Sequence, residues 1–178
     1  MIDAVQFARQ WLLASSAVQA FLIEFGDGGY PVFGEVLPEH FDPTSNPAIV
    51  VSRKGGLPHA EIAALIDSDV QVRVWAGVNQ FALAASLYAA VYDTMHSQSM
   101  VTFAGYGTAM NSVASDEGQS IVDEDSGWAT MIGHFHILLR QDQSSTLPTW
   151  IDDTQTIQEY IDSYVTLIDG GEPGENFS

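Results

Sequence analysis

The chain contains no cysteine and very few basic residues. The lack of cysteine excludes disulfides, thiolate metal sites and cysteine nucleophiles. Five Lys and Arg stand against 23 Asp and Glu, which gives a formal net charge of −18, and the five are scattered along the chain at Arg9, Arg53, Lys54, Arg73 and Arg140. A nucleic-acid-binding surface needs a stripe of positive charge that neutralises phosphates. The sequence therefore argues against a protein that binds nucleic acid tightly.

Long apolar runs and a leader segment are also missing. No run approaches the roughly 18 apolar residues that cross a bilayer, and no basic segment precedes an apolar stretch at the N-terminus. We therefore expect a soluble protein that is made in the cytoplasm and has no membrane partner. The absence of cysteine fits a reducing compartment, and 178 residues suffice for one sizeable core.

The excess of acid has two interpretations. One is a solvated acidic surface of the kind that suits salty surroundings. The other is that some of the charge lines a passage through which an anionic polymer slides without sticking. Acid is densest between Ser115 and Gly127. Five carboxylates there cannot be buried unpaired, so we expect an acidic hairpin loop that projects from the fold, with these candidates for a lumen: Asp116, Glu117, Asp123, Glu124 and Asp125.

The clearest structural signal is one strand followed directly by one long helix. From Asp69 to Trp75 apolar and polar residues alternate, which predicts a half-buried strand. The apolar spacing then becomes helical, which predicts a largely buried, Ala-rich helix over 79–96 that packs on the sheet. Asn79 is the expected N-cap, because its side-chain oxygen can accept a free first-turn N–H.

The other patterns fit the same fold class. Strands are expected around 30–33, 48–54, 100–103, 109–114 and 128–140, and a helix over 3–14. We predict an α+β domain over 1–140, with a mostly antiparallel sheet of about four to five strands flanked by helices. One strand pair beside the crossing helix is expected to be parallel.

Residues 141–178 are predicted to form a separate extension, made of a polar linker, one amphipathic helix and a disordered end. A helix this short is marginal alone in water, so we expect residues 150–168 to dock on a neighbouring subunit or on an adjacent ring. Trp75, on the outward side of its strand, is a further candidate for burial by a partner. The assembly candidates are Trp75, Trp150, Ile157, Tyr160, Ile161 and Tyr164.

The sequence contains few candidates for catalytic or metal-binding residues. His134 and His136 lie two residues apart on a strand and share one face, as a metal pair would, but no third ligand is evident and surface histidines are the simpler interpretation. No Gly-x-Ser-x-Gly motif is present. We therefore predict no catalytic residue, no metal and no cofactor. The alternative that stays open is a small-molecule-binding or enzymatic α+β domain that uses the sheet face around these histidines.

An ordered set of segments resembles the tail-completion (tail-terminator or neck) proteins of long-tailed bacteriophages. These segments, which span roughly residues 3–140, are an N-terminal helical hairpin that ends in a glycine loop, Tyr30–Glu35, the proline-flanked strand Pro47–Gly56, Val70–Trp75, the helix start Gln80–Ala84 and the closing strand into Leu138–Arg140. The acidic stretch at 115–127 and the extension from Gln141 depart from the family pattern.

The resemblance implies a structural virion protein and no enzyme. Members of that family are α+β subunits that assemble into a ring, commonly a hexamer, which caps the tail tube or joins it to the head. Genomic DNA passes through the hole without specific binding. The implied partners are copies of this chain, the tail tube protein and the head-completion or neck proteins, in a particle assembled in the host cytoplasm. A head-closure or minor capsid protein is the neighbouring alternative.

Overall fold

The computed structural model describes residues 3–25, 29–58 and 65–140. These contain three helices, α1 (Ala4–Ala14), α2 (Ser16–Gln19) and α3 (Phe81–Met95). They also contain seven strands: β1 (Val32–Gly34), β2 (Ala48–Pro58), β3 (Leu65–Val78), β4 (Val101–Phe103), β5 (Gly107–Ala114), β6 (Gln119–Val122) and β7 (Trp128–Arg140). The extension predicted at 141–178 lies outside the described residues.

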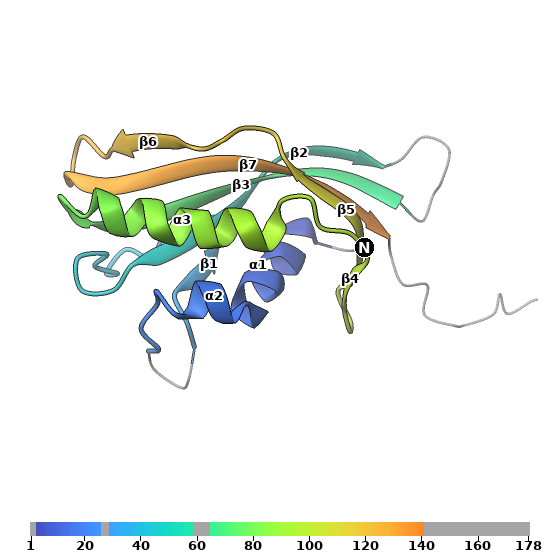
Figure 1. The fold of residues 1–178 in the computed structure, drawn as a ribbon, viewed down its shortest axis with the longest axis horizontal. Helices are drawn as coiled ribbons and strands as arrows, with labels where there is room; N and C mark the ends of the chain where they lie inside the picture. The colour runs from blue at the N-terminus through green and yellow to red at the C-terminus, as the bar shows by residue number, and fades with distance from the viewer. Residues whose placement is uncertain (1–2, 26–28, 59–64, 141–178) are drawn as a thin grey trace, which may run out of the picture. The chain divides into compact units, whose positions relative to one another are not determined.

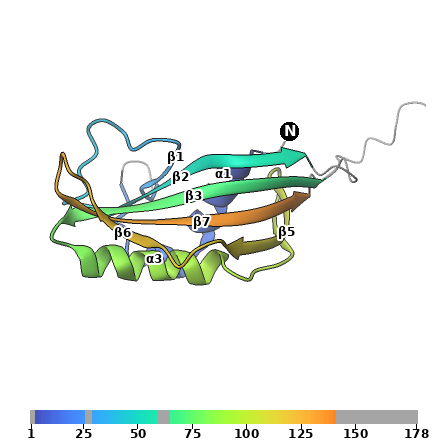
Figure 2. The same ribbon diagram turned by 90° about the horizontal axis from the view of Figure 1, so that it is seen from above.

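All seven strands belong to one sheet. The order is β1-β2-β3-β7-β5-β4, and β6 pairs with β7 beside β5. Figure 2 shows the long strands β2, β3 and β7 side by side, with β5 and β6 following one another along β7. The sheet is therefore larger than the predicted four to five strands. The parallel pair is β1 with β2, whereas the strands on either side of α3 belong to antiparallel pairs.

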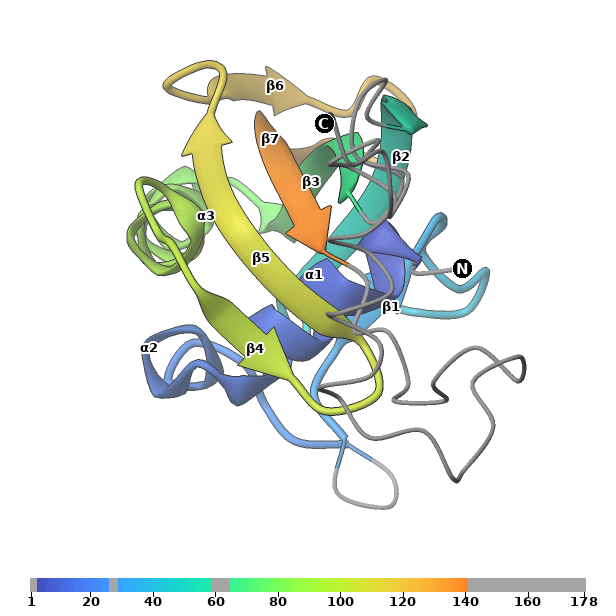
Figure 3. The same ribbon diagram turned by 90° about the vertical axis from the view of Figure 1, so that its right-hand side faces the viewer.

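The helices cover one side of this sheet. Figures 1 and 3 show α1, α2 and α3 on the same side, with the sheet curling over α1. α3 packs on β3, β5 and β7, and α1 packs on β1, β2, β3 and β4. The strands supply alternate residues to this core, as period-2 burial requires: Ile49 and Val51, Val70, Val72 and Val74, and Phe135, Ile137 and Leu139, all fully buried.

The strand-to-helix unit matches the sequence prediction in type, with two differences. α3 buries one stripe only, made of Ala84, Leu87, Tyr88, Val91 and Met95, so the helix is half-exposed instead of largely buried. One layer of sheet can cover only one side of a helix, and the described chain supplies no second layer for the rest of α3.

The second difference concerns the helix start. Asn79 is not the N-cap, because it adopts a left-handed conformation with φ of 61°, which Asn tolerates better than most residues. The N-cap position belongs to Gln80, which makes no side-chain capping bond. Instead the Gln80 side-chain oxygen accepts the backbone N–H of Gly77 at 3.0 Å and closes the turn out of β3.

None of the described helices is long and apolar enough to span a bilayer.

Candidate functional site on the open face of the sheet

The side of the sheet away from the helices carries most of the polar side chains of the long strands. We call it the open face and define it by Val50, Ser52 and Lys54 on β2, Asp67, Asp69, Gln71, Arg73 and Trp75 on β3, and Ile132, His134 and His136 on β7. The strand register places Gln71 opposite His134 and Asp69 opposite His136. The two histidines therefore share one face, as their spacing predicted.

His134 is held by two partners. Its Nδ1 lies 2.6 Å from Oδ2 of Asp116, and its Nε2 lies 2.9 Å from Nε2 of Gln71. A neutral ring that donates from Nδ1 to the carboxylate and accepts from the Gln71 amide satisfies both contacts. Asp116 Oδ1 also accepts the backbone N–H of His134 at 3.2 Å. β5 and β6 pair with successive parts of β7. Between those two parts, the Asp116 carboxylate takes the place of a strand carbonyl as the acceptor for the His134 N–H.

His136 lies between two carboxylates. Its Nε2 is 2.8 Å from Oδ1 of Asp67 and its Nδ1 is 2.9 Å from Oδ1 of Asp69. A ring protonated on both nitrogens donates to both oxygens. Asp67 and Asp69 were not predicted as partners of His136. Their odd-numbered alternation with Gln71 was visible in the sequence, but the pairing of β3 with β7 was not.

The two histidines do not converge on one point. Each ring nitrogen faces its own partner, and no cluster of three His, Asp or Glu in the described part of the chain is arranged to hold a metal ion. That the protein binds no metal stays a prediction, and metal analysis of the purified chain tests it. The open face is therefore a network of hydrogen bonds and ion pairs at a solvent-facing surface.

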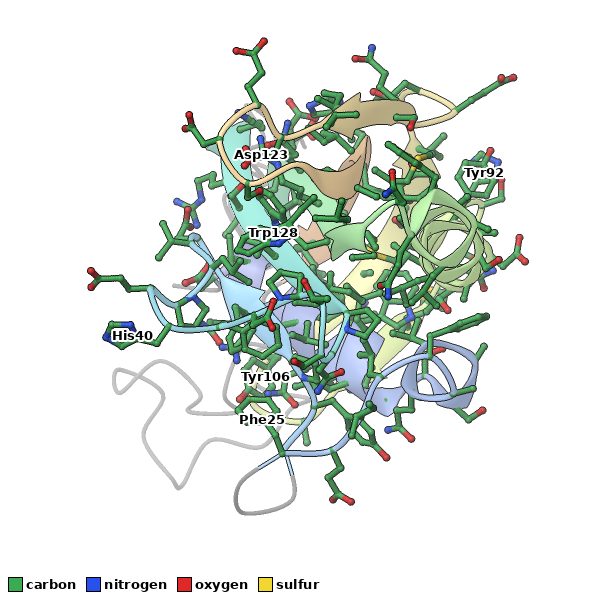
Figure 4. The ribbon with its side chains drawn as sticks, turned by 90° about the vertical axis from the view of Figure 1, so that its left-hand side faces the viewer. Phe25, His40, Tyr92, Tyr106, Asp123 and Trp128 are labelled. Carbon is green, nitrogen blue, oxygen red and sulfur yellow. The ribbon has the colours of Figure 1, made fainter. Side chains whose placement is uncertain are left out.

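The acidic stretch is not one projecting loop. Residues 119–122 form β6, which pairs with β7, and the reversal is the short turn from Asp123 to Trp128. Figure 4 shows Asp123 and Trp128 near one another at this end of the sheet. All four residues of β6 are exposed. The strand therefore carries no alternation of buried and exposed positions, which is the signal from which a strand is predicted.

The five lumen candidates consequently fall into two groups. Asp116 binds His134, and Asp123 Oδ2 accepts the backbone N–H of Ser126 at 3.0 Å and the Ser126 hydroxyl at 2.5 Å. Hydrogen bonds from the Ser126 hydroxyl and backbone N–H lower the pKa of Asp123. Glu117, Glu124 and Asp125 are exposed and flank β6 at its two ends.

Trp75 is more covered than its outward position predicted. Its ring meets Trp128 edge to face with centroids 6.0 Å apart, and the Arg73 guanidinium lies 5.4 Å from its ring centroid. The indole nitrogen is buried and has no hydrogen-bond partner among the described residues. The other five assembly candidates, Trp150, Ile157, Tyr160, Ile161 and Tyr164, lie outside the described residues.

The comparisons with known proteins identify a similar fold but no sequence family. No protein-family model matches the sequence, and no curated protein matches it. Among solved structures, the fold matches a chain in a structure described as the virion of a native gene transfer agent (GTA) particle. That match has a TM-score of 0.54 at 18% sequence identity and covers 78% of this chain and 98% of that chain. The described domain therefore has the fold of a chain found in a virion particle.

Asp116→Asn should weaken the fold at neutral pH. Burial of the Asp116 carboxyl by itself raises its pKa, but the hydrogen bonds from His134 and from the Gly118 N–H outweigh this, so the pKa is lowered. A lowered pKa stabilises the fold above the unfolded value of about 4, and that stability is lost as pH falls through the folded pKa. We expect a loss of about 1 kcal/mol at pH 7.

Urea unfolding at pH 7 and pH 3 measures the effect. The difference between Asp116→Asn and the parent should be smaller at pH 3, because below the unfolded pKa of about 4 the unfolded parent binds a proton more readily than the folded parent does. Glu117→Gln is the matched control, since this neighbouring carboxylate is exposed and its replacement should change stability by less than about 0.5 kcal/mol. An equal loss at both pH values would refute the ionic contribution.

Proposed function

We propose that this chain is a structural virion protein of a bacteriophage or phage-like particle. It forms a ring at the tail end or at the head–tail connection, and DNA passes through the ring. The observation that carries the proposal is the match of fold to a chain of a gene transfer agent virion, which extends over nearly all of that chain. The ordered segments that resemble tail-completion proteins support it independently.

The proposed protein is not an enzyme, and the charge of the chain fits this role. A net charge of −18 opposes tight binding of DNA, as a channel wall requires. The polar side chains of the open face are engaged in separate hydrogen-bonded pairs, and no catalytic constellation is recognised among its described residues. Its partners would be copies of itself, the tail tube protein and the neck proteins, with the protein located in the virion.

Size-exclusion chromatography with light scattering, followed by negative-stain microscopy, tests the ring. The purified chain should have a mass that is a multiple of 19.3 kDa, with six copies as the expected number, and should appear as annular particles. A chain that stays monomeric at roughly 100 μM, a concentration at which contacts of about 5–6 kcal/mol or stronger are populated, would contradict the proposal.

The edge of the sheet that carries β6 is the proposed lining of the DNA passage. Glu117, Glu124 and Asp125 should repel phosphate there, and each approach of two unit charges to 4 Å costs about 1 kcal/mol in water. Replacing the three by Gln, Gln and Asn should leave the fold intact and slow DNA ejection or packaging by roughly a few-fold, because DNA then stays longer on the wall.

The matched control neutralises three exposed acids elsewhere, namely Glu24, Glu39 and Asp93. This control changes the net charge by the same amount, so a general charge effect would appear in both variants. The rate is measured as DNA release from particles reconstituted with each variant. If the β6 variant releases DNA at the parent rate, this edge does not line the passage.

A further inference from the structure

A shallow groove of about 330 Å³ lies on the open face between β2, β3 and the segment that follows β1. Its lining residues are Glu35, Val36 and Leu37 on one side and Val50, Ser52, Lys54, Gln71, Arg73 and Trp75 across the strands. Val36 at its rim is 70% exposed. Apolar walls with a few placed charges are typical of ligand-binding sites, and grooves that accept alternate side chains recognise short peptide segments.

The charge of this groove is opposite to that of the chain. Lys54 and Arg73 are two of only five basic residues in the protein. Two of the other basic side chains are engaged elsewhere: Arg53 lies 3.5 Å from Asp3, and Arg9 donates to the Val32 carbonyl and to Gln6. Glu35 is the one acidic residue that lines the groove. The groove is therefore suited to an acidic segment with apolar side chains.

Such a segment exists in the same chain. From Gln141 to the end the sequence holds eight acidic residues and no Lys or Arg. The stretch Trp150-Ile151-Asp152-Asp153 places two large apolar side chains directly beside two carboxylates. We propose that this tetrapeptide of a neighbouring copy docks in the groove, with Trp150 or Ile151 against Val36 and Trp75 and with Asp152 and Asp153 facing Lys54 and Arg73.

The reach of the chain favours a neighbouring copy over the same chain. Arg140 pairs with Leu65, and Arg73 lies eight residues further along β3, which corresponds to about 26 Å. The nine residues from 141 to 149 span at most about 30–32 Å when fully extended. An intrachain connection would have to reverse at the end of β7 and stay almost straight, at a high entropic cost. A copy beside it in the proposed ring, on which this inference rests, has no such constraint.

Crosslinking tests the contact in the full-length protein. Because the chain has no cysteine, Val36→Cys and Ile151→Cys each introduce a single thiol. The two single variants are mixed, one with an N-terminal tag, and treated with a short bismaleimide. We expect a mixed dimer in at least fivefold greater yield than with Val122→Cys in place of Val36→Cys. Val122 is 50% exposed on β6, outside the groove.

Charge reversal in the same crosslinking experiment tests the proposed ion pairs. Lys54→Glu in the Val36→Cys chain should lower the yield severalfold, and Asp152→Lys in the Ile151→Cys chain should restore it. Lys54 is exposed, so its replacement leaves the core intact. Equal yields from Val36→Cys and Val122→Cys, or no effect of Lys54→Glu, would overturn the inference. So would crosslinking within one chain of a Val36→Cys/Ile151→Cys double variant when the mixture gives none.

Light scattering of the same samples before crosslinking separates this inference from the proposed function. An oligomer without the mixed product leaves the ring standing and removes the groove contact. A monomer removes the ring itself.

Discussion

The Gly133→Ala variant should lose about 2–3 kcal/mol of folding free energy, which corresponds to a fall in Tm of roughly 5–10 °C. Gly133 lies in the middle of β7, on the side that faces α3, and a Cβ added there would overlap the hydroxyl and ring of Tyr88. Tyr88 is 4% exposed, so its ring has little room to move away. Thermal and urea unfolding of both proteins measure the loss.

Tyr88→Phe tests whether the loss in Gly133→Ala comes from overlap with the Tyr88 side chain. The Tyr88 hydroxyl is buried and has no hydrogen-bond partner in the described residues, and burial, with a smaller contribution from the Asp116 charge, raises its pKa to about 12. Removing the hydroxyl should cost little alone and should recover part of the Gly133→Ala loss. A coupling of about 1 kcal/mol in the double-mutant cycle is expected.

The control for the glycine substitution is Gly29→Ala. Among the described residues, the nearest atom to a Cβ added at Gly29 is the Phe25 carbonyl oxygen at 3.9 Å, an ordinary contact. This variant should be as stable as the parent or slightly more stable, because Ala restricts the unfolded chain more than Gly does. If Gly133→Ala also matches the parent, the close packing of Tyr88 on β7 is wrong.

The sequence predicted those parts of the fold that repeat locally. The alternation in β3 and the inward residues of β7, Phe135, Ile137 and Leu139, are in place because a strand with one buried face must alternate. The helix over 79–96 is found as Phe81–Met95 for the corresponding reason at helical spacing. The α+β class follows from these elements.

What the sequence did not reveal depends on pairing between distant residues. β6 has no buried face, so its strand conformation comes only from its hydrogen bonds to β7. Asp116 resembles a loop carboxylate in the sequence, yet it lies against His134, 18 residues away. Gly133 interrupts an otherwise bulky strand to make space for a tyrosine on α3. Each case requires the register of β7 with its neighbours, which no local pattern contains.

The difference between the predicted and observed β2 has the same origin. The strand predicted around 48–54 stops before the pair Gly55-Gly56, and glycine weakens strands. Instead β2 continues to Pro58 beyond a register shift between Arg53 and Gly55. A β-bulge absorbs the extra residue and increases the local twist. The partner strand β3, which extends back to Leu65, stabilises this continuation.

A chain that ends at Arg140 should keep its fold and lose its assembly. Fully burying one Leu- or Ile-sized side chain is worth about 1.5–3 kcal/mol, so losing two anchors per contact weakens association by about 3 kcal/mol or more, over a hundredfold in Kd. Circular dichroism and unfolding report the core, and light scattering over a range of concentrations reports the oligomer.

Charge makes this truncation informative. Removing residues 141–178 changes the net charge from −18 to −10, which reduces repulsion between copies and by itself favours assembly. Loss of the oligomer would therefore have to come from lost contacts. The full-length Ile157→Asn/Ile161→Asn variant, which alters the predicted apolar face, should reproduce the loss, whereas Gln158→Asn/Asp162→Asn, off that face, should not. A truncated chain that forms the same oligomer with the same stability would show that the extension takes no part in assembly, since neither its anchors nor its charge would then affect the contact between copies.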